Sequence, residues 1–238
     1  MTHAKTFTVA AIALLGLLIS EYSAAQTVRC TTWNLEWFPN GSVKETPAAQ
    51  QEQRIKEAAD VLRPIDSDII LLQGVRDYDV CARLGDAIAP GVYHVAICCA
   101  FKGPFQRGLG KQQVAILSKY QAQAAWAEPW KSMNGVDPPR GFAFAWFKIG
   151  NENIGVYSVH LKSNLITHGD KEAETAKNIQ KREVAVTQLV AHVRDIIETT
   201  CAERGGLSLL SIELAPNHNH EAKSSIPIRL NCGRGFIL

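Results

Sequence analysis

Apolar residues occur in short blocks along the chain, and these blocks predict a series of strands. Val28 to Phe38 (VRCTTWNLEWF) is rich in β-branched and aromatic residues, which predicts a strand ending near Trp33 and Asn34. Ile69 to Leu72 is uninterruptedly apolar, a pattern typical of a strand covered on both faces. Further strands are predicted at 114–117 and in RGFAFAWFKI and NIGVYSVHLK, which would form a hairpin with its turn at 150–153.

Two other stretches have helical spacing. Thr46 followed by Pro47 predicts a helix N-cap and a first helical residue. This first helix would end near Arg63 and Pro64, and a second would run from Asp170 to about 197. The apolar positions expected to face the core are Ile55, Ala59 and Leu62 in the first helix and Ile179, Val186, Val190 and Val193 in the second.

Strands and helices that alternate in this way predict an α/β layered fold with mixed sheets. The segment between the second and third strands contains cysteines and is predicted to be irregular. After Thr200 the periodicity is lost, and Asp195 is the last aspartate of the chain. Residues 26–200 are therefore expected to form the domain, and residues 201–238 a divergent tail.

The first 25 residues have a composition of their own. One lysine precedes an apolar run from Phe7 to about Ile19, and small residues follow before Gln26. This pattern predicts a secretory signal peptide over residues 1–25, and hence a secreted or periplasmic protein. An uncleaved membrane anchor is the alternative, although about twenty apolar residues are normally needed to cross a bilayer.

Charge and cysteine content add two constraints. The formal net charge of +2 is too small to indicate nucleic-acid binding through bulk charge alone. Six cysteines in an exported chain permit disulfides, and a bridge from Cys81 to Cys98 or Cys99 is the favoured pairing. Cys30 is expected to be a buried thiol, and no Cys/His spacing resembles a zinc site.

Polar residues follow several of the predicted strands, where a purely structural core would not require them. Asn34, Gln73, His160, Ser163 and Asn164 all lie at such positions. Ligand sites in layered α/β folds gather outside strand ends, so these side chains suggest a binding crevice. Each has a structural alternative, because an Asn after a strand is usually a turn residue and a lone His is usually a packed one.

Five segments follow one another along the chain: TTWNLEWF, DIILLQGVRD, QVAILSKY, RGFAFAWF and YSVHLKSN. Their order resembles that of the endonuclease/exonuclease/phosphatase family. The resemblance covers Val28 to Val193. It implies a four-layered α/β sandwich of two mixed sheets with outer helices, incomplete in this chain. It also implies a metal-dependent phosphodiesterase that uses Mg²⁺ or Mn²⁺ on a phosphodiester substrate, with nucleic acid as the expected partner.

The resemblance assigns roles to particular residues. Asn34 matches the asparagine that helps organise the metal and the phosphate, and His160 matches the histidine that contacts the scissile phosphate. Arg140 and Asn164 are candidates for substrate binding. Gly74 occupies the position of the glutamate that is the family's principal metal ligand, so metal binding is expected to be weakened. Asp77 and Glu36 are the nearby carboxylates that would have to compensate.

The C-terminal part departs from the family pattern as well. The family's Gly-Asp-Phe-Asn segment and its later Asp-His pair have no counterpart after Asp195. The NHNH at 217–220 lacks the metal-ligand pattern of His-Asn-His nucleases. A frameshifted or rearranged reading frame would explain the change of character, and a Gly-Asp-x-Asn segment in another frame downstream would be its signature.

Two functions follow from these residues. The first is an exported Mg²⁺-dependent phosphodiesterase whose activity is impaired in this chain. The second is a catalytically dead relative that at most binds phosphate or nucleic acid. Loss of several groups that act as a unit in catalysis favours impairment.

Overall fold

The described part of the chain forms nine strands, three α-helices and a 3₁₀ turn. The computed structural model describes residues 27–103, 108–166, 168–204, 208–212 and 225–229. In chain order the elements are β1 (Thr27–Phe38), α2 (Ala48–Leu62), η1 (Arg63–Ile65), β2 (Ile69–Val75), α3 (Tyr78–Ile88), β3 (His94–Cys98), β4 (Gln113–Ser118), β5 (Ala122–Pro129), β6 (Gly141–Ile149), β7 (Glu152–Val159), α4 (Lys171–Arg204), β8 (Ser208–Ile212) and β9 (Ser225–Arg229).

The strands form two mixed sheets. The first has the order β3-β4-β2-β1-β9, in which β1 and β2 are parallel and the other neighbours antiparallel. The second has the order β5-β6-β7-β8, in which only β7 and β8 are parallel. The predicted hairpin is confirmed as β6 and β7, whose last pair is Ile149 with Glu152.

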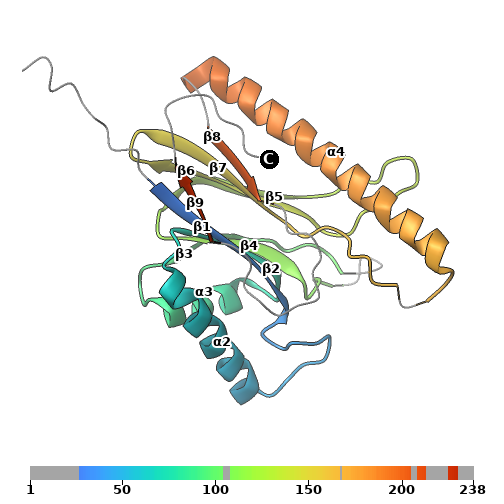
Figure 1. The fold of residues 1–238 in the computed structure, drawn as a ribbon, viewed down its shortest axis with the longest axis horizontal. Coiled ribbons are helices and arrows are strands. Elements are labelled where there is room, and N and C mark those ends of the chain that lie inside the picture. The colour runs from blue at the N-terminus through green and yellow to red at the C-terminus, as the bar shows by residue number, and fades with distance from the viewer. Residues whose placement is uncertain (1–26, 104–107, 167, 205–207, 213–224, 230–238) are drawn as a thin grey trace, which may run out of the picture.

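Helices cover the outer faces of the two sheets (Figure 1). Helices α2 and α3 lie on one side of the molecule and the long α4 on the other, with the sheets between them. This is the predicted four-layered α/β sandwich. None of the helices in the described ranges is long and apolar enough to cross a membrane.

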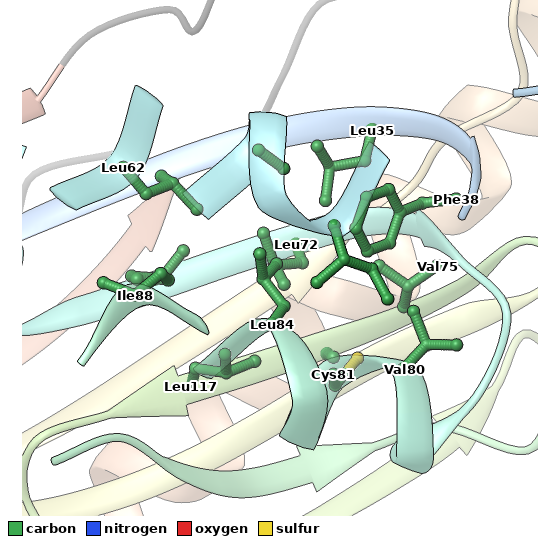
Figure 2. Close-up of a cluster of buried hydrophobic side chains, with 14 of the residues drawn as sticks. Leu35, Phe38, Leu62, Leu72, Val75, Val80, Cys81, Leu84, Ile88 and Leu117 are labelled. Carbon is green, nitrogen blue, oxygen red and sulfur yellow. The ribbon is translucent and has the colours of Figure 1, made fainter. Parts of the chain in front are cut away.

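Three clusters of buried side chains hold the layers together. The one between the sheets joins residues such as Ile69, Ile116 and Val156. The second fixes α2 and α3 to the first sheet, and Figure 2 shows its Leu72, Val75, Leu84 and Leu117. The third fixes α4 to the second sheet and includes Phe142, Phe144, Tyr157, Ala185 and Leu189. Burying each large apolar side chain contributes about 1.5–3 kcal/mol, so these contacts explain why the sheets stack.

The start of α2 differs from the prediction. Its N-cap position is Pro47 rather than Thr46, and no side chain caps the helix there. The Thr46 hydroxyl donates to Asn40 Oδ1 at 3.0 Å instead, so a tertiary contact replaces the cap. The predicted buried face is correct, since Ile55, Ala59 and Leu62 are all buried.

The predicted apolar face of α4 is wrong in part. Ile179 and Val186 are 42% and 36% exposed, whereas Ala185 and Leu189 are buried against the second sheet. The position of the sheet selects a face rotated from the one that the spacing indicates. The helix itself begins as predicted, because Asp170 Oδ1 accepts from the backbone N–H of Ala173 at 2.8 Å.

The segment predicted to be irregular contains α3 and β3. Among the described residues, Cys30, Cys81, Cys98 and Cys99 are free thiols, so the predicted bridge from Cys81 is not formed in this structure. Cys81 and Cys98 nevertheless belong to one cluster, beneath α3. Cys30 is buried, as predicted.

Two sequence predictions fall on other parts of the chain. The signal peptide at 1–25 and the NHNH segment lie outside the described residues. Of residues 205–238, the structure describes only β8 and β9. The backbone of β8 pairs with β7, and that of β9 with β1.

Candidate active site

The ends of β1, β2 and β7 meet through a buried polar bridge between the two sheets. Gln73 on β2 donates through Nε2 to Ser158 Oγ on β7 at 3.1 Å and to Thr32 Oγ1 on β1 at 3.3 Å. Asn34 is the register partner of Gln73, and His160 lies two residues after Ser158. The structure therefore places three of the predicted strand ends at one end of the sandwich.

Gly74, the position of the expected metal ligand, has a backbone conformation that favours glycine. Its φ is +73°, and the pairing of β1 with β2 shifts register at this point. A Cβ atom at Gly74 would lie 2.8 Å from Asn34 Oδ1 and 3.0 Å from the backbone nitrogen of Glu36. Real Cβ atoms essentially never show the first distance, so the Asn34 side chain would have to shift, and the second is tight enough that the backbone of Glu36 would have to give slightly.

The segment over Gly74 is held by its own contacts. Asn34 Oδ1 accepts from the backbone N–H of Glu36 at 3.2 Å, and Glu36 and Trp37 have φ of +47° and +56°. Arg54 on α2 donates to the carbonyl oxygen of Leu35 at 3.1 Å. Asn34, the residue matched to the metal and phosphate site, thus closes a local turn in this structure.

Asp77 is engaged in holding α3. Its Oδ1 accepts from the backbone N–H of Val80 at 2.9 Å, which makes it the N-cap of the helix. Its Oδ2 accepts from Arg76 Nε at 2.8 Å, and Arg76 also pairs with Glu45 at 2.9 Å. A carboxylate in this position is already neutralised by its partners and does not replace the missing glutamate.

The described residues around Gly74 form no cluster of carboxylates for a divalent cation. Mg²⁺ and Mn²⁺ prefer carboxylate and other oxygen ligands in a strict geometry. Within the described residues, no group of three or more His, Cys, Asp or Glu side chains could hold a metal ion. Gly74 supplies no carboxylate, and Asp77 is occupied.

His160 is held neutral. Burial, followed by the positive charge of Arg140, lowers the pKa of His160 to about 3. Its Nδ1 atom is buried and has no hydrogen-bond partner among the described residues. At neutral pH the imidazole is therefore uncharged and has one polar atom that a ligand could satisfy.

Arg140 holds the backbone that follows β7 in place. It donates through Nε to the carbonyl oxygen of His160 at 2.9 Å and through Nη2 to that of Leu161 at 3.0 Å. Burial lowers the pKa of Arg140 to about 10, so the guanidinium stays charged at neutral pH. The structure shows a positioning role for Arg140, and its contact with substrate stays a prediction.

Asn164 lies beside a residue that sequence reasoning missed. Its Oδ1 accepts from Arg182 Nη1 on α4 at 2.7 Å, and the same Nη1 donates to the carbonyl oxygen of Lys162 at 3.1 Å. Ser158 and Arg182 were not singled out in the sequence. The alternation of β7 could have indicated that Ser158 points inward with Val156, whereas nothing local marks Arg182.

The chain is similar to known proteins in sequence and in fold. The model of a family described as Endonuclease/Exonuclease/phosphatase matches residues 31–221. No curated protein matched the chain. The human Nocturnin catalytic domain, solved with a bound sulfate anion, is 14% identical with a TM-score of 0.51, over 78% of this chain and 63% of that one.

Two further solved structures have slightly lower TM-scores. TDP2 from C. elegans is 15% identical with a TM-score of 0.49, over 87% of this chain and 56% of that one. A β-hairpin deletion mutant of beta toxin from Staphylococcus aureus is 15% identical with a TM-score of 0.47, over 72% and 62%. The alignment thus spans about half the length of TDP2, and at such identities the likeness concerns the fold alone.

Proposed function

Because the chain belongs to the endonuclease/exonuclease/phosphatase family, we propose that it is an exported phosphodiesterase whose Mg²⁺-dependent hydrolysis is impaired. Members of this family generally depend on a divalent metal ion. The proposed substrate is a phosphodiester, with nucleic acid favoured. The second candidate is a catalytically inactive relative that binds phosphate or nucleic acid, and the absence of a fitting metal site among the described residues favours it.

The observation that carries the proposal is the geometry at Gly74. A ligand-bearing side chain there would collide with Asn34 Oδ1 and the backbone of Glu36. The site therefore lacks the carboxylate, and a side chain could enter this position only if the Asn34 side chain and the Glu36 backbone shifted. Hydrolysis that needs a cation at this position should fall steeply, since removal of one essential interaction commonly lowers kcat by orders of magnitude.

The remaining residues support the binding of a phosphate group. Neutral His160 lies at the end of β7, with a buried nitrogen that has no partner among the described side chains. Arg140 keeps this segment in place through two backbone carbonyls. A neutral imidazole donates or accepts one hydrogen bond at each nitrogen, so His160 can orient a phosphoryl oxygen but cannot neutralise its charge.

A plasmid assay tests this proposal. Purified protein is incubated with supercoiled DNA and Mg²⁺ or Mn²⁺, with and without a chelator, and nicking is measured on a gel. Gly74→Glu and Gly74→Ala are compared because both share the strained backbone position and only the first adds a carboxylate. We expect little nicking by the unmodified protein. Rapid chelator-sensitive nicking by the unmodified protein would refute the impaired reading.

The variants separate the two candidate functions. Metal-dependent nicking gained by Gly74→Glu, but not by Gly74→Ala, would show that the carboxylate alone was missing. No nicking by either variant, together with phosphate or DNA binding by the unmodified protein, would favour the binding function. Export is tested separately, by N-terminal sequencing of the protein recovered outside the cytoplasm, where a start near Gln26 is expected.

A further inference from the structure

Positively charged side chains gather where the chain leaves β7 and turns towards α4. Arg140 donates to the carbonyl oxygens of His160 and Leu161 at 2.9 Å and 3.0 Å. Arg182 donates to the carbonyl oxygen of the next residue, Lys162, at 3.1 Å. Both guanidinium groups therefore contact one three-residue segment. Four residues make up what we call the basic cluster: Arg140, Lys162, Lys181 and Arg182.

Among the described residues, the charge of the basic cluster is compensated only in part, by Glu174. In the described part of the chain, none of its four members forms an ion pair. Burial, followed by the charges of Lys181, Arg140 and Arg182, lowers the pKa of Lys162, and only Glu174 acts in the opposite direction. Glu174 is itself paired with Lys177 at 2.7 Å. Like charges held this close repel one another, and an anion would relieve that repulsion.

The basic cluster also has hydrogen-bond donors to spare. The Lys181 ammonium group makes no hydrogen bond with any described residue, and Lys162 Nζ makes one, to the carbonyl oxygen of Ser163 at 3.0 Å. Arg182 uses only Nη1, which leaves Nη2 and Nε for a ligand. Guanidinium and ammonium groups that donate to phosphate oxygens form the stronger class of hydrogen bonds.

We propose that the basic cluster binds a phosphate group with two negative charges, and does so without a metal ion. A terminal phosphate carries about −1.5 to −2 charges at pH 7 and three acceptor oxygens, which suits several cations better than a diester with one charge. The unpartnered Nδ1 of His160 lies on the same segment. This inference rests on the proposed function for the substrate, because the phosphate would belong to a nucleotide or an oligonucleotide end.

The test uses the full chain in a chelating buffer, so that no metal contributes. Inorganic phosphate is titrated by calorimetry at constant ionic strength, with chloride as the reference anion. We expect Lys181→Gln to weaken phosphate binding about tenfold, a change of ~1.4 kcal/mol. The Lys181 side chain makes no hydrogen bond with a described residue that the substitution would break. The control is Lys56→Gln on α2, in the opposite outer layer, which should leave the affinity unchanged.

Two oligonucleotides distinguish the possible sources of the phosphate. A short single strand with a 5′-phosphate is compared with the same strand ending in a 5′-hydroxyl. Tighter binding of the phosphorylated strand, lost in Lys181→Gln, supports a terminal-phosphate site. Binding of inorganic phosphate alone, also lost in Lys181→Gln, supports a site for the free ion. Equal binding of both strands without any binding of inorganic phosphate, or affinities unchanged by Lys181→Gln, would overturn the proposal.

The outcome is independent of hydrolysis. All measurements are made without a divalent cation, so a protein that never cuts DNA can still bind phosphate. Conversely, a protein that nicks plasmid with Mg²⁺ but shows no phosphate binding in chelator would support the phosphodiesterase and refute the basic cluster as a binding site.

Discussion

The conformation at Gly74 leads to a quantitative prediction for Gly74→Ala. A left-handed backbone costs a non-glycine residue about 1–2 kcal/mol, and loss of glycine's freedom in the unfolded chain returns about 0.4–1 kcal/mol. The new Cβ would also lie 2.8 Å from Asn34 Oδ1. Displacing that side chain breaks its hydrogen bond to Glu36, which contributes about 0.5–1.5 kcal/mol, and shifts a packed backbone.

A matched control isolates the close contact. Gly91 has φ of +71°, close to the +73° of Gly74, but a Cβ there would meet no atom within 4 Å. Both substitutions carry the same backbone penalty and the same gain in the unfolded state. We therefore expect Gly74→Ala to lower the free energy of unfolding by about 2 kcal/mol more than Gly91→Ala does.

Urea unfolding followed by fluorescence measures both variants, and the denaturant slope reports whether the unfolded state is unchanged. The double variant Asn34→Ala with Gly74→Ala should recover part of the loss, because it removes the side chain that the new Cβ meets. Equal effects of Gly74→Ala and Gly91→Ala would refute the conclusion that the polypeptide fills the space beside Gly74.

Three further predictions concern residues around the sheets. Trp126 Nε1, which can only donate, lies 3.2 Å from His192 Nε2, and burial lowers the pKa of His192. His192 therefore adds stability that is full above pH ~6.5 and is lost as the pH falls through its lowered folded-state pKa. His192→Phe should weaken the pH dependence of the unfolding free energy across this range. Asp77→Ala should lower the melting temperature through loss of a helix cap that contributes about 1 kcal/mol, and Asp77→Asn should retain most of it. Ser158→Ala leaves Gln73 Nε2 with a single partner and should cost about 1–3 kcal/mol in urea unfolding.

The fold could be predicted from the sequence where segments are strongly patterned. The apolar run of β2 indicated a strand buried on both faces, and every residue from Ile69 to Val75 is buried. The prediction failed where a local pattern competes with a tertiary contact. Thr46 bonds to Asn40 rather than capping α2, and the second sheet selects a face of α4 that leaves Ile179 exposed.

The candidate site was only partly predictable. Asn34, His160 and Gly74 could be singled out from their segments, because the chemistry expected there depends on residue type. The engagement of Asp77 could not be foreseen, since its partners are a helix N-terminus and Arg76. Arg182 was missed because it approaches Lys162 across 20 positions of the chain.

The sequence by itself determined that position 74 is a glycine and supplies no carboxylate, because residue identity is read directly from the sequence. Only the tertiary structure decided that a side chain added there would meet Asn34 Oδ1 and the backbone of Glu36 in a left-handed backbone conformation. The space beside Gly74 is filled by Asn34 and Glu36, which come from a neighbouring strand about 40 residues earlier in the chain. The physical reason is that excluded volume and left-handed backbone geometry depend on where distant segments pack, and residue types alone do not specify that.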